Sequence, residues 1–315
     1  MDISFIIINW NTCRLLINCL RSIQNTVTGY QYDIFVVDNG SIDGSVDEVR
    51  KQFGSQINLI ENTQNRGFAR ANNQALRIAK SNYIVLLNSD TVLKNGALNA
   101  LIEFLDHTPS AAMVGPRLID ADGTLQNSYD NFPELLTELL NKSLLRALFP
   151  AKYSGKKTAR SDPFEVDSLI GACIAIRHTA IEQVGLLDED YFFFLEETDW
   201  CFRMRTAGWK IFHDPRVEVI HLQGQSKQRS PADARIEYYR SLYKFFRKNR
   251  SSLSYLTLRI FRMVKLIINL ALNFIGLCLT MGTKRKYRDK SAFYAYILCW
   301  HFMLCPDSWG LRKSH

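Results

Sequence analysis

Short apolar runs alternate with polar stretches of helical spacing over the first ninety residues. The runs ISFIIINW, DIFVVDNG, INLIEN and YIVLLNSD each predict a strand. The stretches between them, from about Thr12 to Thr26, from near Ser45 and from about Ala69 to Lys80, predict helices. Short helical crossovers between apolar strands are typical of a parallel sheet with helices on both faces. The chain is therefore expected to begin with a Rossmann-like α/β half.

The pattern continues less regularly beyond residue 90. A helix is expected from Gly96 to His107, a strand at 113–120, and ordered structure again from 166 to 178. The intervening stretch 130–165 holds three prolines and the run SGKKTARSD, which predict a mobile loop over the ligand-binding site that is described next. The segment IFHDPRVEVIHLQGQS is expected to close the domain near Ser226.

Two of the predicted strands end on acidic residues. Asp90 follows the run YIVLL closely, and DIFVVDNGS ends on Asp38 and Asn39. Parallel sheets bind ligands beyond the carboxyl ends of their strands, so Asp38 and Asp90 are expected to share one edge of one sheet. This placement favours binding of a nucleotide with a divalent cation. The sequence contains no GxGxxG or Walker loop, so other residues must hold the phosphates.

Charge divides the chain in two. At 315 residues with 47% hydrophobic composition, the chain can bury one large α/β core and still carry an appendage. Residues 1–226 hold 21 Lys and Arg against 27 Asp and Glu, whereas residues 227–315 hold 18 basic and 4 acidic residues. A basic tail points to an anionic surface, either membrane lipid or nucleic acid. We expect a catalytic domain at 1–226 and a basic, amphipathic helical region at 227–315.

Two apolar runs characterise this tail. The segment 254–281 begins with basic residues spaced through apolar ones and ends in sixteen uncharged residues; KRKYRDK then precedes a second run at 292–305. Neither run clearly reaches the roughly 20 apolar residues that span a bilayer, so helices lying in the membrane interface are expected. A helical packing subdomain and the face of a homodimer are the alternatives.

The cysteines indicate a reducing compartment. Seven cysteines form no CxxC pair and no metal-ligand spacing, and are expected to be reduced thiols. The apolar stretch 3–8 has no basic residues before it and is too short for a signal peptide, unless a leader has already been removed. The expected location is cytoplasmic, peripheral on the inner face of the cell membrane.

Six stretches, taken together, resemble one family of enzymes. These stretches are VVDNGSIDGS at 36–45, NRGFARANNQA at 65–75, LLNSDT at 86–91, LIGACIAIR at 169–177, FFFLEETDWCFR at 192–203 and HLQGQS at 221–226. On these stretches the chain resembles family 2 glycosyltransferases of the GT-A fold, in the rhamnosyltransferase-like branch, over about residues 3–226. The resemblance implies a Rossmann-like, mostly parallel sheet with flanking helices. The basic, apolar tail adds a C-terminal helical extension that is expected to associate with membranes.

The resemblance implies a site for a nucleotide-sugar donor. Asp38 would accept hydrogen bonds from the nucleobase, Gly67 would permit close backbone approach, and Gly171 would leave room for the sugar. Turn, cap and strand-packing roles are the alternatives, notably for Asn72. The residues expected at this site are Asn11, Asp38, Asn39, Asn65, Arg66, Gly67, Asn72, Asn88, Ser89, Gly171 and Ala172.

The resemblance also implies a divalent cation. LNSDT occupies the place of the family's DXD motif, with Asn88 in place of the first acid. Asp90 would bind the metal directly and His221 would complete its ligand set. Oxygen ligands and phosphate partners favour Mg²⁺ or Mn²⁺, and an imidazole ligand favours manganese slightly. A helix cap for Asp90 and a hydrogen-bonded strand residue for His221 are the alternatives.

The catalytic base is expected in FLEETDW. Its second acid, Glu197, would remove the acceptor hydroxyl proton while the metal stabilises the departing diphosphate. Glu196 is the second choice, and Asp199 would contact the acceptor or hold the loop. The alternative is an exposed acidic start of a helix.

These features predict an inverting glycosyltransferase of cell-surface polysaccharide synthesis. We expect transfer of rhamnose from dTDP-rhamnose to a glycan or lipid-linked acceptor, with a UDP-hexose as the rival donor. A sugar nucleotidyltransferase would carry a Gly-rich basic loop near its first strand, which SFIIINWNTCR lacks. A basic membrane or nucleic-acid adaptor would leave the acidic edge of the sheet without a purpose, so no nucleic-acid partner is expected.

Overall fold

The computed structural model describes residues 1–140, 142–149, 160–222 and 230–312. The chain divides into two compact units. We call them the α/β unit and the helical unit. The α/β unit comprises Met1–Phe132, Lys156–Phe192 and Glu196–Lys227; the helical unit comprises Pro133–Gly155, Phe193–Leu195 and Gln228–His315.

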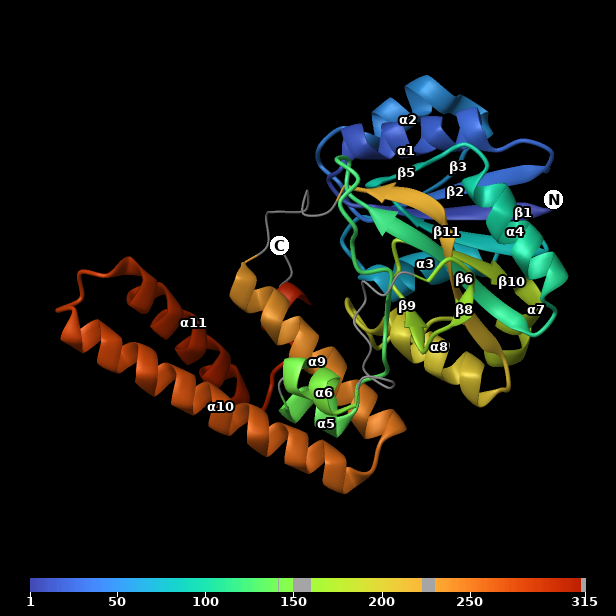
Figure 1. The fold of residues 1–315 in the computed structure, drawn as a ribbon. Helices are drawn as coiled ribbons and strands as arrows, with labels where there is room; N and C mark the ends of the chain where they lie inside the picture. Colours follow the sequence, from blue (N-terminus) through green and yellow to red (C-terminus); the bar gives the residue numbers. More distant parts are fainter. Residues whose placement is uncertain (141, 150–159, 223–229, 313–315) are drawn as a thin grey trace. The chain divides into compact units, whose positions relative to one another are not determined.

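In the described part of the α/β unit, a nine-stranded sheet forms the centre (Figure 1). Its strands are β1 (Ile3–Asn9), β2 (Tyr32–Asp38), β3 (Asn58–Glu61), β4 (Tyr83–Asn88), β5 (Thr91–Leu93), β6 (Ala111–Ile119), β8 (Phe164–Glu165), β10 (Cys173–Arg177) and β11 (Lys210–His221). The strand order is β3-β2-β1-β4-β10-β6-β11-β5, with β8 beside β11. The first four strands in this order are parallel, as are β6 and β11, whereas β10 runs antiparallel to both of its neighbours. A separate two-stranded sheet pairs β7 (Tyr129–Asp130) with β9 (Ser168–Leu169).

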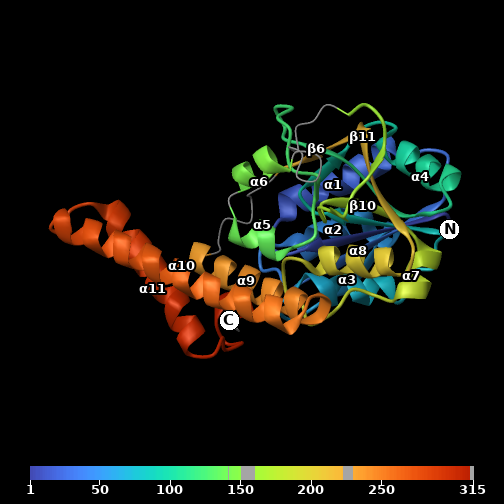
Figure 2. The same ribbon diagram turned by 60° about the horizontal axis from the view of Figure 1, so that its bottom comes forward.

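Helices cover both faces of the nine-stranded sheet (Figure 2). Successive residues of a strand point to opposite faces, so Phe5 and Ile7 of β1 enter one core while Ile6 enters the other. The first core includes α1 (Cys13–Thr26), α2 (Ser45–Phe53) and α4 (Ala97–His107); the second includes α3 (Phe68–Leu76), α7 (His178–Val184) and α8 (Glu196–Thr206). The predicted mostly parallel α/β sheet with flanking helices is therefore confirmed.

The strand register brings the carboxyl ends of β1, β2 and β4 beside one another. Asn9 of β1 pairs with Asp38 of β2, and Ile8 pairs with Asn88 of β4. Asp90 follows two residues after the end of β4. The carboxyl ends of β1, β2 and β4 therefore meet at one edge, which was the expected place for the acidic residues.

The helical unit is built mainly from three long helices. They are α9 (Pro231–Asn249), α10 (Ser252–Leu279) and α11 (Arg285–Phe302). Tyr243 stacks on Trp300 with ring centroids 6.5 Å apart, and its hydroxyl is 2.8 Å from Nε2 of the buried His301. By length and composition, the 28-residue α10 is the one helix in the described residues that could cross a membrane, so the expectation that neither apolar run clearly reaches a spanning length is not met for this helix.

The expected loop at 130–165 is wrong in part. Two short helices, α5 (Leu135–Leu139) and α6 (Lys142–Leu148), occupy about a third of this stretch. Leucines at helical spacing lie between Pro133 and Pro150, and the prolines were given more weight than this spacing. Glu138 of α5 forms an ion pair with Arg262 of α10, within the helical unit. Residues 150–159 lie outside the described part.

Candidate active site

Asp38 organises the turn that follows β2. Its side chain is buried, with one carboxylate oxygen 2.8 Å from Asn9 Nδ2 and the other accepting from the backbone N–H of Ser41 at 2.8 Å. Asn11 contributes to the same corner, because its side-chain oxygen accepts from the backbone N–H of Ile42 at 2.8 Å. Asp38 and Asn11 thus hold the loop in shape, and any nucleobase contact would use their remaining lone pairs.

A second network fixes the loop before α3. Asn39 Nδ2 donates to Asn65 Oδ1 at 2.9 Å, and Asn39 Oδ1 accepts from the backbone N–H of Arg66 at 3.0 Å. Gly67 has φ +84° and ψ 170°, a backbone region that is essentially restricted to glycine. A Cβ at Gly67 would lie 2.6 Å from the carbonyl oxygen of Phe192. Hydrogen bonds therefore join Asn39 to the loop 65–67, and Gly67 of this loop packs against Phe192 in the segment that leads toward α8.

Asn72 differs from its neighbours. Its Nδ2 donates to the carbonyl of Phe68 at 2.9 Å, while its buried Oδ1 has no hydrogen-bond partner among the described residues. Asn73 instead binds the carbonyl of Leu187 and the carboxylate of Glu189. The two asparagines separate into one with an unused acceptor and one with a structural role.

The loop after β4 is tied to β1 and to β11. Ser89 Oγ lies 2.8 Å from Thr12 Oγ1, which donates to Asn9 Oδ1 at 2.7 Å. β5 pairs with β11 so that Thr91 lies opposite His221. Asp90 and His221 therefore become neighbours, and Asp90 Oδ1 is 3.4 Å from His221 Nε2.

This pair suits a divalent cation. Two ligands of one octahedral cation, each about 2.1 Å from it, lie roughly 3 Å apart, which is close to the observed 3.4 Å. Among the described residues, no group of three or more His, Cys, Asp or Glu side chains is placed to hold a metal ion. Asp90 and His221 would therefore supply two ligands, and phosphate oxygens and water would supply the others.

Sequence reasoning missed Gln126. It lies just after the turn that follows β6, and its Oε1 is 2.9 Å from Nδ1 of His221. A single glutamine in a polar turn has many ordinary uses, so the sequence carried no signal for this contact. Asn9 and Thr12 were missed for the same reason.

The acidic residues of α8 have different surroundings. Asp199 is fully buried and pairs with Arg203 at 2.9 Å, while the hydroxyl of Tyr191 lies 3.3 Å from it. These contacts hold the start of α8 to the preceding segment. Glu196 is also buried, and Trp200 belongs to the core with its indole N–H bound to the carbonyl of Gly185.

Glu197 has the surroundings of a reactive carboxylate. A Cβ at Gly171 would lie 3.7 Å from its carboxyl carbon, an ordinary van der Waals distance, so Gly171 lies directly beside the carboxylate. Its Oε2 is buried and has no hydrogen-bond partner among the described residues. Burial raises the pKa of Glu197 to about 6, although backbone N–H groups, including that of Gly171, act in the opposite direction.

Gly171 and Ala172 connect Glu197 to the metal-competent pair. The carbonyl of Ala172 accepts from the backbone N–H of Asn88 at 2.9 Å, and Asn88 stands two residues before Asp90. The predicted base, the predicted sugar-facing residues and Asp90 therefore belong to the same edge of the sheet. Had these residues lain at different edges of the sheet, they could not have acted together on one substrate.

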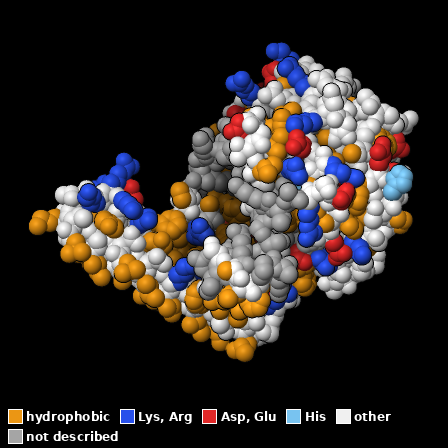
Figure 3. All heavy atoms as spheres, viewed as in Figure 1, with side chains coloured by type: hydrophobic (Ala, Val, Ile, Leu, Met, Phe, Trp, Pro, Cys, Tyr) orange, Lys and Arg blue, Asp and Glu red, His pale blue; other side chains and the backbone are white. Residues whose placement is uncertain are grey.

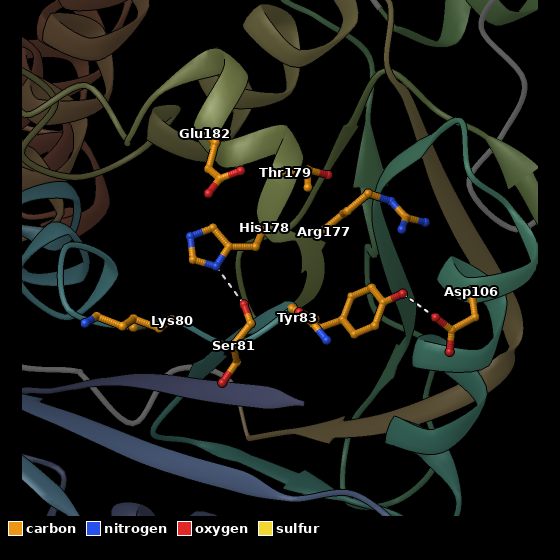
Figure 4. A pocket seen from close by; sticks show the side chains of 10 residues that line it. Lys80, Ser81, Tyr83, Asp106, Arg177, His178, Thr179 and Glu182 are labelled. Carbon is orange, nitrogen blue, oxygen red and sulfur yellow. Dashed lines mark hydrogen bonds between the residues drawn. The ribbon is translucent and has the colours of Figure 1, made fainter. Parts of the chain in front are cut away.

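A cavity of about 580 Å³ lies elsewhere in the α/β unit (Figure 4). Its lining comes from the amino end of β4 and from α7, so it is at the opposite edge of the sheet. His178 Nδ1 lies 2.6 Å from the carbonyl of Ser81, Tyr83 binds Asp106, and Arg177 donates to three backbone carbonyls. These groups satisfy one another, and no predicted site residue lines the cavity.

Comparison with known proteins identifies the family of this chain. The profile described as "Glycosyl transferase family 2" matches residues 4–185. The chain is 27% identical over 233 residues to an N-acetylglucosaminyl-diphospho-decaprenol L-rhamnosyltransferase of Mycobacterium tuberculosis, covering 69% of this chain and 75% of the relative. It is 26% identical over 227 residues to the low-salt glycan biosynthesis hexosyltransferase Agl10 of Haloferax volcanii, covering 70% and 67%.

Solved structures show the same fold. A mannosyltransferase from Pyrobaculum calidifontis in complex with GDP-Man and Mn²⁺ has a TM-score of 0.57 at 15% identity, covering 96% of this chain and 86% of that one. GalNAc-T7 with UDP, GalNAc and Mn²⁺ has a TM-score of 0.56 at 16% identity, covering 77% and 47%. The α/β unit therefore has the GT-A fold, as predicted.

The fold and the site define a nucleotide-sugar-dependent glycosyltransferase. The chain belongs to glycosyl transferase family 2, which confirms the family inferred from its motifs.

Gly67 offers a test of the packing beside the site. Gly67→Ala should destabilise the protein by more than about 2 kcal/mol, because the new methyl group meets the backbone of Phe192 in addition to the strain of positive φ. Gly96→Ala is the matched control, since Gly96 has φ +74° and open space around it, and should cost about 1 kcal/mol. Urea unfolding midpoints would measure both; equal losses would contradict the close approach.

The buried carboxylate of Glu197 predicts a pH-dependent cost. The native pKa of about 6 lies above the unfolded value of 4.5, so the free energy of unfolding should fall as pH rises through this window. The cost above pH 6 is about 2 kcal/mol. Glu197→Gln should remove this cost, making the variant more stable than the wild type at pH 8 and not at pH 4. Urea unfolding at both pH values would measure the difference, and a difference independent of pH would contradict the burial argument.

Proposed function

We propose that the protein is an inverting, metal-dependent glycosyltransferase that transfers rhamnose from dTDP-rhamnose to a glycan or lipid-linked acceptor. The observation that carries the proposal is that the Asp90–His221 pair and Glu197, whose Oε2 has no hydrogen-bond partner among the described residues, belong to one edge of the sheet. The rhamnosyltransferase and hexosyltransferase named above support sugar transfer in glycan synthesis. A UDP-hexose donor is the alternative, favoured by the hexosyltransferase relative.

Glu197 acts as the general base. Its Oε2 takes the proton of the acceptor hydroxyl as the acceptor oxygen forms a bond to C1 of the sugar and the bond from C1 to the diphosphate oxygen breaks. Attack from the face opposite the leaving group inverts the configuration at C1. A base whose pKa is about 6 is deprotonated near neutral pH and retains useful basicity. Glu196 is the second choice for this role.

Asp90 and His221 would hold the cation, Mg²⁺ or Mn²⁺. When bound, a divalent cation neutralises charge that develops on the departing diphosphate. The chain's own contribution is to bring the carboxylate and the imidazole together through the β5–β11 pairing. The remaining predicted residues, from Asn11 and Asp38 to Gly171 and Ala172, line the donor site beside this pair.

The helical unit associates with the inner membrane surface. Apolar side chains along α10 are exposed: Leu253, Leu256, Ile260, Val264, Ile267, Ile268, Leu272, Phe274, Ile275 and Leu279. Five Lys and Arg residues between 284 and 290 follow this helix, and Figure 3 shows basic side chains close to the apolar band. Basic flanks are retained on the cytoplasmic side of membranes and attract anionic lipid, which supports association of α10 with the inner surface.

Removing the proposed base should abolish turnover and spare donor binding. Glu197→Gln should lower kcat at least about 100-fold with dTDP-rhamnose and a lipid-linked acceptor, because the amide cannot take the hydroxyl proton. The wild type should lose kcat/KM below about pH 6, where Glu197 becomes protonated. Product formation would be followed by mass spectrometry and donor binding by calorimetry.

Two comparisons make this result interpretable. Glu182→Gln changes an exposed glutamate that lines the cavity at the opposite edge, and should leave kcat unchanged. A UDP-hexose assayed in parallel distinguishes the rival donor. Unchanged transfer by Glu197→Gln would refute its role as the base, and transfer from UDP-hexose alone would refute the rhamnosyl donor.

The membrane proposal predicts a strong effect of charge on α10. Leu272→Glu with Ile275→Glu should lower cosedimentation with vesicles containing anionic lipid at least tenfold, because both side chains are more than half exposed on the apolar face. Ile78→Glu is the control, since Ile78 is 51% exposed on the α/β unit. Equal binding by the wild type and the double variant would overturn the proposal.

A further inference from the structure

We propose that Gln126 is a positioning residue that fixes the tautomer of His221 and so presents His221 Nε2 to the cation. The inference rests on the metal site proposed above. It assigns a role to a residue outside the motifs that identify the family. The role follows from the hydrogen bonds of one amide group, all within the α/β unit.

The orientation of the Gln126 amide is determined by its neighbours. Its Nε2 is 2.7 Å from Asp120 Oδ1 and 2.7 Å from the carbonyl oxygen of His221. Both are acceptors, so the atom that faces them must be the NH₂ group. Turning the amide over would place its oxygen against a carboxylate and a carbonyl. Gln126 Oε1 is therefore the atom beside Nδ1 of His221, at 2.9 Å.

The tautomer of His221 follows from that orientation. An amide oxygen only accepts hydrogen bonds, so Nδ1 of His221 must carry a hydrogen atom. In the neutral imidazole, Nε2 then has a free lone pair. This lone pair faces Asp90 Oδ1 at 3.4 Å. Two acceptors that face each other repel, and a cation between them turns the repulsion into two favourable contacts.

Asp120 keeps the amide in place. It follows directly after β6, and the turn that it opens is closed by hydrogen bonds between Asp120 and Thr124 and between Asp120 and Gly123. The backbone N–H of Gln126 also binds the carbonyl of Leu118 at 2.9 Å. Gln126 thus projects from a short, braced turn. A hydrogen bond to the second nitrogen of a metal-binding histidine orients the ring, and its loss typically weakens metal affinity 10-fold to 100-fold.

The first measurement needs no metal and no substrate. Nitrogen NMR of the ¹⁵N-histidine-labelled full chain at mildly alkaline pH, where imidazole is neutral, reports which ring nitrogen carries hydrogen. The signals of His221 are identified as those lost in His221→Ala. The wild type should carry the hydrogen on Nδ1, and Gln126→Leu should move it wholly or partly to Nε2.

The second measurement is Mn²⁺ affinity, read from the electron paramagnetic resonance of free Mn²⁺ in the presence of dTDP. Gln126→Leu should raise the Kd for Mn²⁺ about 10-fold to 100-fold. Asp120→Asn keeps an acceptor with less charge, so it should give a smaller increase and serves as the second variant if Gln126→Leu does not fold. Asp122→Ala is the control, because Asp122 belongs to the same turn but is exposed and accepts from the backbone N–H of Thr124.

The outcomes separate this proposal from the proposed function. The proposal is overturned if His221 of the wild type carries its hydrogen on Nε2, or if Gln126→Leu changes neither the tautomer nor the Kd for Mn²⁺. A Kd raised equally by Asp122→Ala would assign the effect to the turn and also overturn it. No Mn²⁺ binding by the wild type, with the tautomer change present, would overturn the proposed metal site and support the tautomer assignment to Gln126.

Discussion

Parallel register between β1 and its two neighbours is the constraint on which the rest of the site depends. Asn9 stands opposite Asp38, and Ile8 stands opposite Asn88, so three loops begin at the same edge. A shift of one residue would exchange the faces of each strand and bury the wrong side chains, because the side-chain period of a strand is two. Ile3, Phe5 and Ile7 facing one core, with Ile6 facing the other, make that shift costly. The packing of apolar residues thereby determines where the polar residues meet.

Polar groups at this edge are of two kinds: those that hold the loops in shape by hydrogen bonds within the protein, and those that are available to a ligand. Buried polar atoms without partners cost free energy, so most of them are satisfied by the chain itself, as Asp38 and Asn39 are. Glu197 Oε2 and Asn72 Oδ1 have no hydrogen-bond partner among the described residues. Asp90 Oδ1 and His221 Nε2 face one another at 3.4 Å. At this edge most polar groups are hydrogen-bonded within the protein, and a few acceptor atoms are not. Such an edge is suited to ligands that supply hydrogen-bond donors, a cation or a proton.

The first strands and the acidic residues at their carboxyl ends could be predicted from the sequence, because an apolar run and the acid that ends it are local signals. Asp38 and Asp90 could be placed in this way, whereas the expected roles of Glu197 and His221 came from the family resemblance. Gln126 could not, because its role depends on a contact with His221, ninety-five positions away. Helices α5 and α6 were hidden by nearby prolines, and the burial of Trp200 could not be predicted without knowing how α8 packs.

The segment before α8 carries backbone strain that the rest of the chain must offset. Phe194 and Leu195 have φ of +72° and +65°, and each such non-glycine residue costs about 1–3 kcal/mol. Within the helical unit, the carbonyl of Phe193 accepts from Ser241 Oγ at 2.9 Å, and the ring of Phe194 lies edge-on to Tyr238. Strain at functional sites persists only where surrounding contacts determine the conformation. The helical unit supplies such contacts to the tripeptide that immediately precedes Glu196 in the chain, so its contribution to the enzyme includes more than the exposed apolar face of α10.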